Sequence, residues 1–172
     1  MSAAMPWPAL PEQAASLALA AAVGIALQLE ALGLRPAIKW PNDLLIDGRK
    51  LAGILPRLRW RGARVRYAQL GVGLNAVNRV PEGAIGVAEA LGFSHHPRAH
   101  PRHLAARLLR GVEWAAAAAG QPELVRRQAE QRLWRPGCVE HAGRHWSVAG
   151  LEVDGGLRLC SGSAVTVLQR RF

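Results

Sequence analysis

The stretch 44–74 restricts the fold more than any other part of the chain, because its pattern is typical of antiparallel strands joined by tight turns. Apolar segments 44–46 and 50–55 flank Asp47-Gly48, a dipeptide that favours a two-residue hairpin turn. We therefore expect a central β-sheet in which strands that follow one another in the sequence also lie side by side.

A second hairpin is predicted directly after the first. Arginines alternate with apolar residues over 57–61, Gly62-Ala63 turns the chain, and 65–74 forms the returning strand. An alternation with a period of two places these arginines together on one solvent-exposed face of the sheet.

Helices are predicted on either side of the hairpins, at 12–32, 104–119 and 124–133, and a short strand is predicted at 37–40. The first helix is rich in alanine and apolar on most faces, as expected for a helix packed inside a core. Its uncharged part, 14–29, is too short for a comfortable membrane span, so no membrane association is expected.

The sequence after residue 135 changes to short apolar alternations separated by glycines, which predict five short strands and a small β-barrel. Cys138 and Cys160 lie far apart and match no metal-site or disulfide spacing. Free thiols of this kind favour a cytoplasmic protein.

The basic residues have an unusual composition. Of the 22 lysines and arginines only two are lysines, Lys39 and Lys50, and both fall in one twelve-residue window. A lysine ammonium is a compact point charge that reaches a carboxylate or a phosphate through a narrow gap, so the two lysines mark a candidate site. The alternative, two ordinary surface lysines near a hairpin, is equally compatible with composition.

Three short motifs surround these lysines: Lys-Trp-Pro-Asn-Asp at 39–43, Gly-Arg-Lys-Leu-Ala-Gly-Ile-Leu at 48–55 and Gly-Val-Gly-Leu-Asn at 71–75. In their order and spacing they resemble the central motifs of the biotin–protein ligases. The resemblance implies an α/β (α+β) fold, with a mixed sheet flanked by helices in a class II synthetase-like core. It also implies a catalytic part over 1–125 and an SH3-like barrel over 126–172.

The resemblance further implies a two-step reaction. Biotin's carboxylate attacks the α-phosphate of ATP to give biotinyl-5′-AMP and pyrophosphate, and the acyl group then passes to a lysine of the biotin carboxyl carrier protein of acetyl-CoA carboxylase. An anion meeting a polyanion requires positive charge at the developing charge. By resemblance Lys50 supplies it, with Asn42 and Asp43 as the other catalytic residues. Asp43 is suited either to hold Mg²⁺ or to accept the proton of the incoming lysine in the second step.

The remaining implied roles concern the two substrates. By resemblance the biotin slot is formed by residues of two neighbouring strands, namely Lys50, Gly53, Ile54, Leu55, Gly71, Gly73 and Leu74. The ATP site is formed by charged and amide side chains, namely Lys39, Asn42, Lys50 and Asn75. Without the resemblance, Ile54, Leu55 and Leu74 are ordinary core residues and Asp43 is an ordinary turn residue.

Two elements of complete ligases are not found in this sequence: an arginine- and glycine-rich loop upstream of the first helix, and the strand that begins the biotin site. Three explanations stay open. The reading frame starts at an internal Met, the chain is a shortened homologue that binds a ligand or carrier without adenylating it, or a second chain supplies the missing part. A homodimer is compatible with the third.

Two further classes compete with a biotin ligase. A lipoate ligase-like protein would share the lysine-and-glycine element at 50–53. A nucleic-acid-binding protein would account for the net charge of +10 and the arginines near 57–66. The Trp-Pro-Asn-Asp run favours biotin over lipoate, and an arginine-rich hairpin face is usually only a solvated face, so nucleic acid is not the expected partner.

Overall fold

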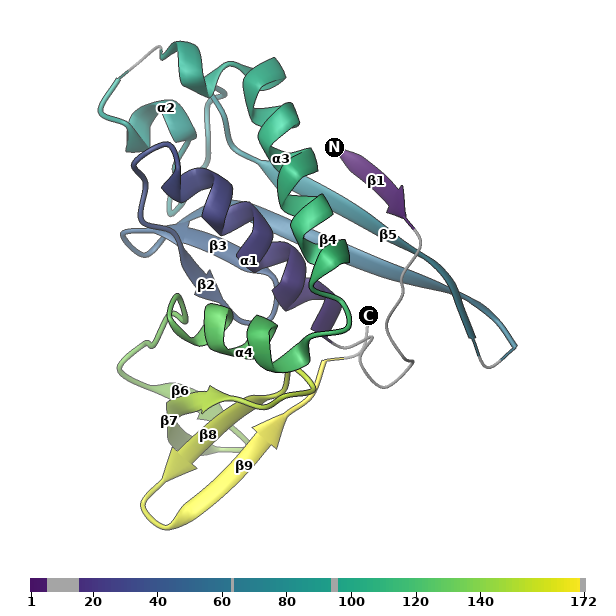
Figure 1. Ribbon diagram of the computed structural model, residues 1–172. Helices are drawn as coiled ribbons and strands as arrows, with labels where there is room; N and C mark the ends of the chain where they lie inside the picture. Colours follow the sequence, from purple (N-terminus) through teal and green to yellow (C-terminus); the bar gives the residue numbers. More distant parts are fainter. Residues whose placement is uncertain (6–15, 63, 94–95, 171–172) are drawn as a thin grey trace.

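The computed structural model describes residues 1–5, 16–62, 64–93 and 96–170. It contains a five-stranded sheet with helices against it and a smaller four-stranded sheet formed by the C-terminal part (Figure 1). The larger sheet has the order β1-β5-β4-β3-β2, and its strands are β1 Ser2–Met5, β2 Ala37–Lys39, β3 Asp43–Ile46, β4 Arg49–Arg61 and β5 Arg64–Leu74.

Every strand pairing in this sheet is antiparallel, so the expected mixed sheet is wrong. The reason lies in the connections, because tight turns join β2 to β3, β3 to β4 and β4 to β5 and leave no room for a parallel crossover. Parallel pairing among the described residues is confined to two isolated bridges, Ile38 with Leu133 and Lys50 with Ala84.

Both predicted hairpins are confirmed. The turn at Asp47-Gly48 has positive φ at both residues, 48° and 76°, as a type I′ turn requires. Strand β4 continues through Pro56 without interruption. The N–H of Ile54 donates to the carbonyl of Asn42, on the edge of β4 that faces β3. The nitrogen of Pro56, two residues on, lies at the same edge but beyond the first residue of β3, so no strand hydrogen bond is lost there.

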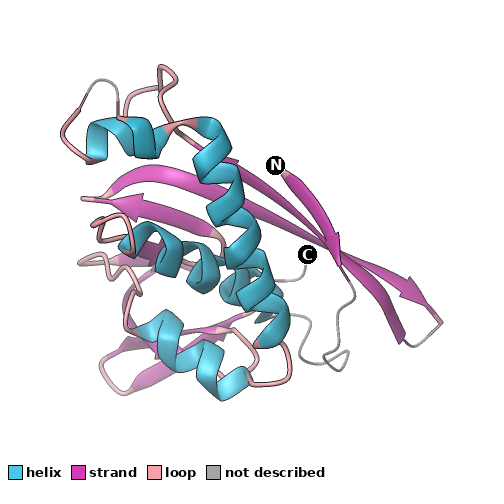
Figure 2. Cartoon of the chain, turned by 45° about the horizontal axis from the view of Figure 1, so that its top comes forward, coloured by secondary structure: helices cyan, strands magenta, loops and turns pink. Residues whose placement is uncertain are grey.

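The helices cover one face of the sheet (Figures 1 and 2). Helix α1 (Leu17–Glu30) packs against the sheet, α3 and α4, and most of its residues are buried, as predicted for a core helix; residues 12–15 of the predicted helix lie outside the described residues. Gly24 of α1 meets Gly111 of α3 backbone to backbone, a contact that leaves no space for a β-carbon. The helical elements after the sheet are α2 Val87–Ala90, the 3₁₀ turn η2 Pro97–Ala99, α3 Pro101–Ala117 and α4 Pro122–Glu130.

Strand β1 was not predicted. Its four residues pair with 68–71 of β5, and the Met1 ammonium donates to the carbonyl of Val72 at 2.9 Å. A strand upstream of the first helix is therefore present, contrary to the expectation from sequence. At the opposite edge, Ile38 exchanges hydrogen bonds with Arg132 and Trp134, which covers the outer side of β2.

The C-terminal sheet is antiparallel in the order β6-β7-β8-β9. Its four strands replace the five expected, because 144–151 forms one continuous strand; they are β6 Val139–His141, β7 Arg144–Leu151, β8 Leu157–Ser161 and β9 Ala164–Leu168. No pairing between β6 and β9 closes it into a barrel among the described residues. The predicted domain boundary after residue 125 falls within α4 and stays a prediction. No described helix is long and apolar enough to cross a membrane.

Candidate functional site

The side chains of Lys50 and Asp43 meet on the sheet face opposite the helices. Their strands, β4 and β3, are joined by the tight turn, and the register of this hairpin brings the Lys50 ammonium to 2.8 Å from Oδ1 of Asp43. The Lys50 side chain is 51% exposed and that of Asp43 is 22% exposed. The lysine can therefore leave the carboxylate and turn toward an incoming anion without first being released from a packed core.

Gly53 provides the space that this ion pair occupies. It lies directly opposite Asp43 in the register of β3 and β4. A β-carbon at this position would lie 3.3 Å from Oδ1 of Asp43 and 3.4 Å from the ammonium of Lys50. On the other side Gly53 faces Gly73 of β5, so two glycines from neighbouring strands leave an opening beside the charged pair.

A hollow of about 460 Å³ begins at this opening. It collects residues from the second and third motifs, together with the loop after β5: Lys50, Leu51, Ala52, Gly53, Gly73, Leu74, Asn75, Asn78, Pro81 and Ala84. Five predicted site residues are thus brought together around one cavity. Its wall combines one ammonium group and the side chains of two asparagines with small and apolar side chains, which suits a ligand that has an anionic end and an apolar body.

Three predicted biotin residues lie elsewhere. Ile54 is 1% exposed and belongs to the hydrophobic core, as the alternation along β4 requires. Leu55 and Gly71 are paired with each other on the open face, one step farther along the sheet, and Leu55 is 53% exposed. Their contact with biotin stays a prediction.

Two asparagines hold the strand ends of the site. The side-chain amide of Asn42 donates to the carbonyl of Ile54 at 2.7 Å, and that of Asn75 donates to the carbonyl of Lys50 at 3.2 Å. Both amides fasten backbone on either side of the ion pair. Asn75 thereby orients the strand segment that carries Lys50.

Lys39, the second lysine, is opposite Asp43 in the register of β2 and β3. Its ammonium lies 5.5 Å from the ring centroid of Trp134, within the range of a cation–π contact. The described structure therefore brings Lys39 near the site in register but pairs its charge with an aromatic ring.

Arg49 is a positioning residue that the sequence analysis missed. Its guanidinium donates to the carbonyl of Ala84 and forms an ion pair with Glu89 at 2.7 Å. The backbone of Lys50 also exchanges hydrogen bonds with Gly83 and Ile85. These contacts hold the loop after β5 against the cavity. They join residues about 35 positions apart in the sequence, so no local sequence pattern predicts them.

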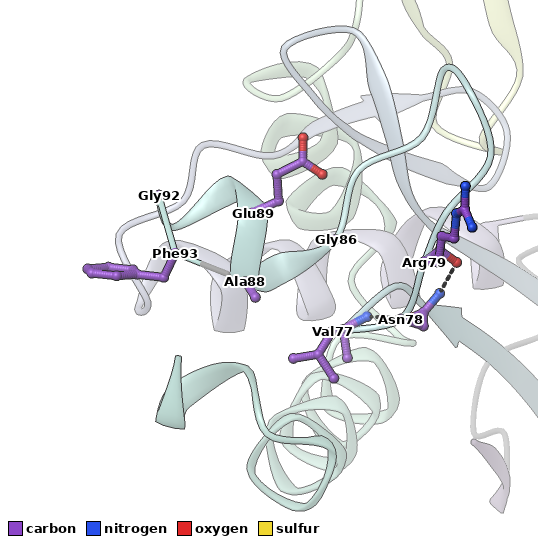
Figure 3. A pocket seen from close by; sticks show the side chains of 9 residues that line it. Val77, Asn78, Arg79, Gly86, Ala88, Glu89, Gly92 and Phe93 are labelled. Atoms are coloured by element: carbon purple, nitrogen blue, oxygen red, sulfur yellow. Dashed lines mark hydrogen bonds between the residues drawn. The ribbon is translucent and has the colours of Figure 1, made fainter. Parts of the chain in front are cut away.

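A second hollow, of about 480 Å³, lies beside the first and shares Asn78 with it (Figure 3). In Figure 3 the Asn78 side chain bonds to the Arg79 backbone, and Glu89 and Phe93 project from the α2 segment. None of the predicted site residues lines it, although it is slightly the larger of the two. We place the site at the first hollow because the Lys50–Asp43 pair borders it.

Comparison with known proteins identifies the matching region. Residues 11–75 match the model of the biotin/lipoate A/B protein ligase family. The bifunctional ligase/repressor BirA of Bacillus subtilis (strain 168) is 46% identical over 66 residues, which are 38% of this chain and 20% of that protein. The biotin–[acetyl-CoA-carboxylase] ligase of Paracoccus denitrificans is 42% identical over 71 residues, which are 41% and 28%. The chain thus matches about a quarter of these relatives' length.

Solved structures extend the likeness to the whole fold. The biotin protein ligase from Aquifex aeolicus in complex with biotin and ATP aligns with a TM-score of 0.77 at 17% identity, covering 98% of this chain and 74% of that one. A biotin protein ligase-like protein of unknown function from Silicibacter sp. aligns with a TM-score of 0.76 at 15% identity, covering 98% and 76%.

The antiparallel sheet with helices on one face is the fold of the solved biotin protein ligases, and residues 11–75 are similar to the biotin/lipoate A/B protein ligase family. The resemblance to the biotin–protein ligases drawn from the three motifs is confirmed over this matched segment.

Proposed function

We propose that this chain acts as a biotin–protein ligase, forming biotinyl-5′-AMP from biotin and ATP and passing biotin to a carrier lysine. The observation that carries the proposal is the Lys50–Asp43 pair at 2.8 Å beside the Gly53–Gly73 opening. A biotin carboxylate and an α-phosphate must approach each other there against their mutual repulsion. An ammonium that is half exposed and held at the cavity rim can offset that charge.

In the first step Lys50 would contact both the carboxylate oxygen and the α-phosphate. The biotin ring would occupy the space left by Gly53 and Gly73, next to Leu74. The ATP would lie toward Asn75 and the loop after β5. Removal of one preorganised donor to a developing charge typically costs about 10²–10³ in rate.

Mg²⁺ fits this arrangement in part. The ion binds proteins through one or two carboxylates and takes its remaining ligands from substrate phosphates and water. Asp43 is the carboxylate paired with Lys50, which lines the cavity, and no group of three or more metal-type side chains gathers anywhere among the described residues. Asp43 would hold the ion, which supplies charge neutralisation at the phosphates, and Lys50 would be free to face the carboxylate.

The second step requires an acceptor, which we propose to be the biotin carboxyl carrier protein of acetyl-CoA carboxylase. The name of the Paracoccus relative supports this choice. Asp43 is suited to accept the proton of the attacking lysine. A cytoplasmic location and an SH3-like C-terminal domain complete the proposal. The second candidate is a homologue that binds ligand or carrier without adenylation, favoured by the short matched length.

The test is biotin-dependent exchange between pyrophosphate and ATP by the purified chain. We expect exchange with biotin and little with lipoate, and a loss of about 10²-fold or more in Lys50→Ala. Arg102→Ala, an exposed basic residue on α3, serves as the control and should exchange normally. Equal background from the wild type and Lys50→Ala would reject the catalytic proposal and favour the binding homologue.

A further inference from the structure

The distal part of the β4–β5 hairpin extends beyond the helices, well past the sheet's other strands (Figures 1 and 2). Residues 49–81, which include this hairpin, contain eight basic residues and no acidic residue. The charge is therefore not balanced within the hairpin, and no ion pair between described residues involves Arg57, Arg59, Arg61 or Arg66.

Two of these arginines share a face with the candidate site. Along β4 the side chains of Leu55, Arg57 and Arg59 continue the face of Gly53 and alternate with buried residues such as Ile54 and Pro56, so they lie on the open side of the sheet. We call the strip formed by Leu55, Arg57 and Arg59, with their β5 partners Gly71, Gln69 and Tyr67, the open strip.

The open strip begins next to the site. At about 3.3 Å per residue, Arg57 lies about 13 Å and Arg59 about 20 Å from the level of Gly53. A protein interface of standard size covers about 800 Å² on each partner, a patch about 30 Å across. A folded protein centred on the Lys50–Asp43 pair would reach about 15 Å and cover Arg57, and one displaced along the hairpin would cover Arg59 as well.

The chemistry of the strip favours a protein over a nucleic acid. Leu55 lies between the site and the arginines with 53% of its surface exposed, and the half-buried Tyr67 is paired with Arg59. Arginine together with aromatic and aliphatic side chains is typical of protein interfaces. A phosphate backbone gains nothing from the exposed leucine.

We propose that the open strip is the docking surface for an acidic face of the protein that accepts the acyl group, with Arg57 and Arg59 as its main contacts. This inference rests on the proposed function, because it assigns a partner of that same site. The arginines would speed encounter and set orientation, and the leucine would supply the apolar contact.

The test measures binding of a purified biotin carboxyl carrier domain to the full chain at several salt concentrations. The variant Arg57→Glu/Arg59→Glu is compared with Arg102→Glu/Arg110→Glu, two exposed arginines on α3 that give the same change in charge on the opposite side of the sheet. We expect Kd to rise about 10-fold or more in the hairpin variant, with a shallower salt dependence, and to change less than 2-fold in the control.

Two further measurements separate the possible results. Biotin-dependent pyrophosphate exchange measures the first step alone, so its absence from the wild type would reject the proposed function. The comparison of carrier Kd values between the two variants would still test the docking surface. Unchanged exchange in the hairpin variant would show that it is folded, and Arg57→Gln/Arg59→Gln provides a milder second variant.

Three outcomes would overturn the inference. The first is an equal loss of carrier binding in both charge-reversal variants, and the second is no loss in either. The third is binding of a random duplex or single-stranded oligonucleotide that the hairpin variant loses while its carrier binding stays intact. A carrier domain whose exposed acidic residues are changed to amides should bind the wild type and the hairpin variant equally.

Discussion

Gly53→Ala tests whether the ion pair is the working part of the site. The added β-carbon would lie 3.3 Å from Oδ1 of Asp43, 3.4 Å from the Lys50 ammonium and 3.5 Å from the carbon that carries it. Only the contact with Asp43 is tighter than ordinary packing, and all three contacts fall on the ends of side chains that can move. The fold should therefore tolerate the change.

The magnitudes follow from this geometry. Removing backbone freedom from the unfolded chain favours alanine by about 0.4–1 kcal/mol, which offsets the local crowding, so thermal stability should be nearly unchanged. The ammonium and the carboxylate must shift, however, and small misplacements of a catalytic group can cost about 10–100-fold in rate. We expect a loss of this size in pyrophosphate exchange at saturating biotin and ATP.

A double-mutant cycle identifies the cause. If Gly53→Ala acts through the lysine, then Lys50→Ala/Gly53→Ala should be no slower than Lys50→Ala alone, because the two changes damage one interaction. Gly120→Ala, where an added β-carbon meets nothing within 4 Å, controls for the substitution itself. Full activity in Gly53→Ala, or losses that multiply with those of Lys50→Ala, would refute the reasoning.

Three further changes test how the fold supports the site, each by thermal unfolding. Gly24→Ala should destabilise the protein by about 1–3 kcal/mol, or about 2–4 °C for each kcal/mol, because the new β-carbon meets the Gly111 backbone of α3; a Tm equal to that of Gly120→Ala would contradict this packing. Trp40→Phe removes a 2.9 Å hydrogen bond to the C-terminal sheet and should cost about 0.5–1.5 kcal/mol; no change would mean that water replaces the bond without loss. Arg132→Ala breaks a two-point ion pair with a glutamate of α1, at 2.6 and 2.8 Å, and should cost about 1–2 kcal/mol; an unchanged Tm at low salt would show that the pair contributes nothing.

The hairpins were predictable because their signals are local. Asp47-Gly48 specifies the turn, and the register of that turn brings Lys50 to Asp43. The ion pair at the centre of the site thus follows from residues within eight positions of one another. The buried helix α1 was predictable for a similar reason, since its alanines leave no polar face.

The missed features depend on distant partners. Strand β1 has only four small or apolar residues, and its identity as a strand comes from pairing with 68–71 rather than from its own pattern. The Arg49 side chain contacts Ala84 and Glu89, which follow β5 in the sequence, and no local pattern around Arg49 predicts these contacts. Ile54 alternates with Gly53 and Leu55 and its side chain lies in the core, while its predicted contact with biotin stays a prediction.

Direct detection of the adenylate tests the central claim. The purified chain is incubated with biotin, ATP and Mg²⁺, and biotinyl-5′-AMP is measured by mass spectrometry beside Lys50→Ala and Arg102→Ala. If Lys50 stabilises the developing charge, the wild type and Arg102→Ala form the adenylate, and Lys50→Ala forms about 10²-fold less or none. No adenylate from the wild type, or equal amounts with and without Lys50, would contradict the account.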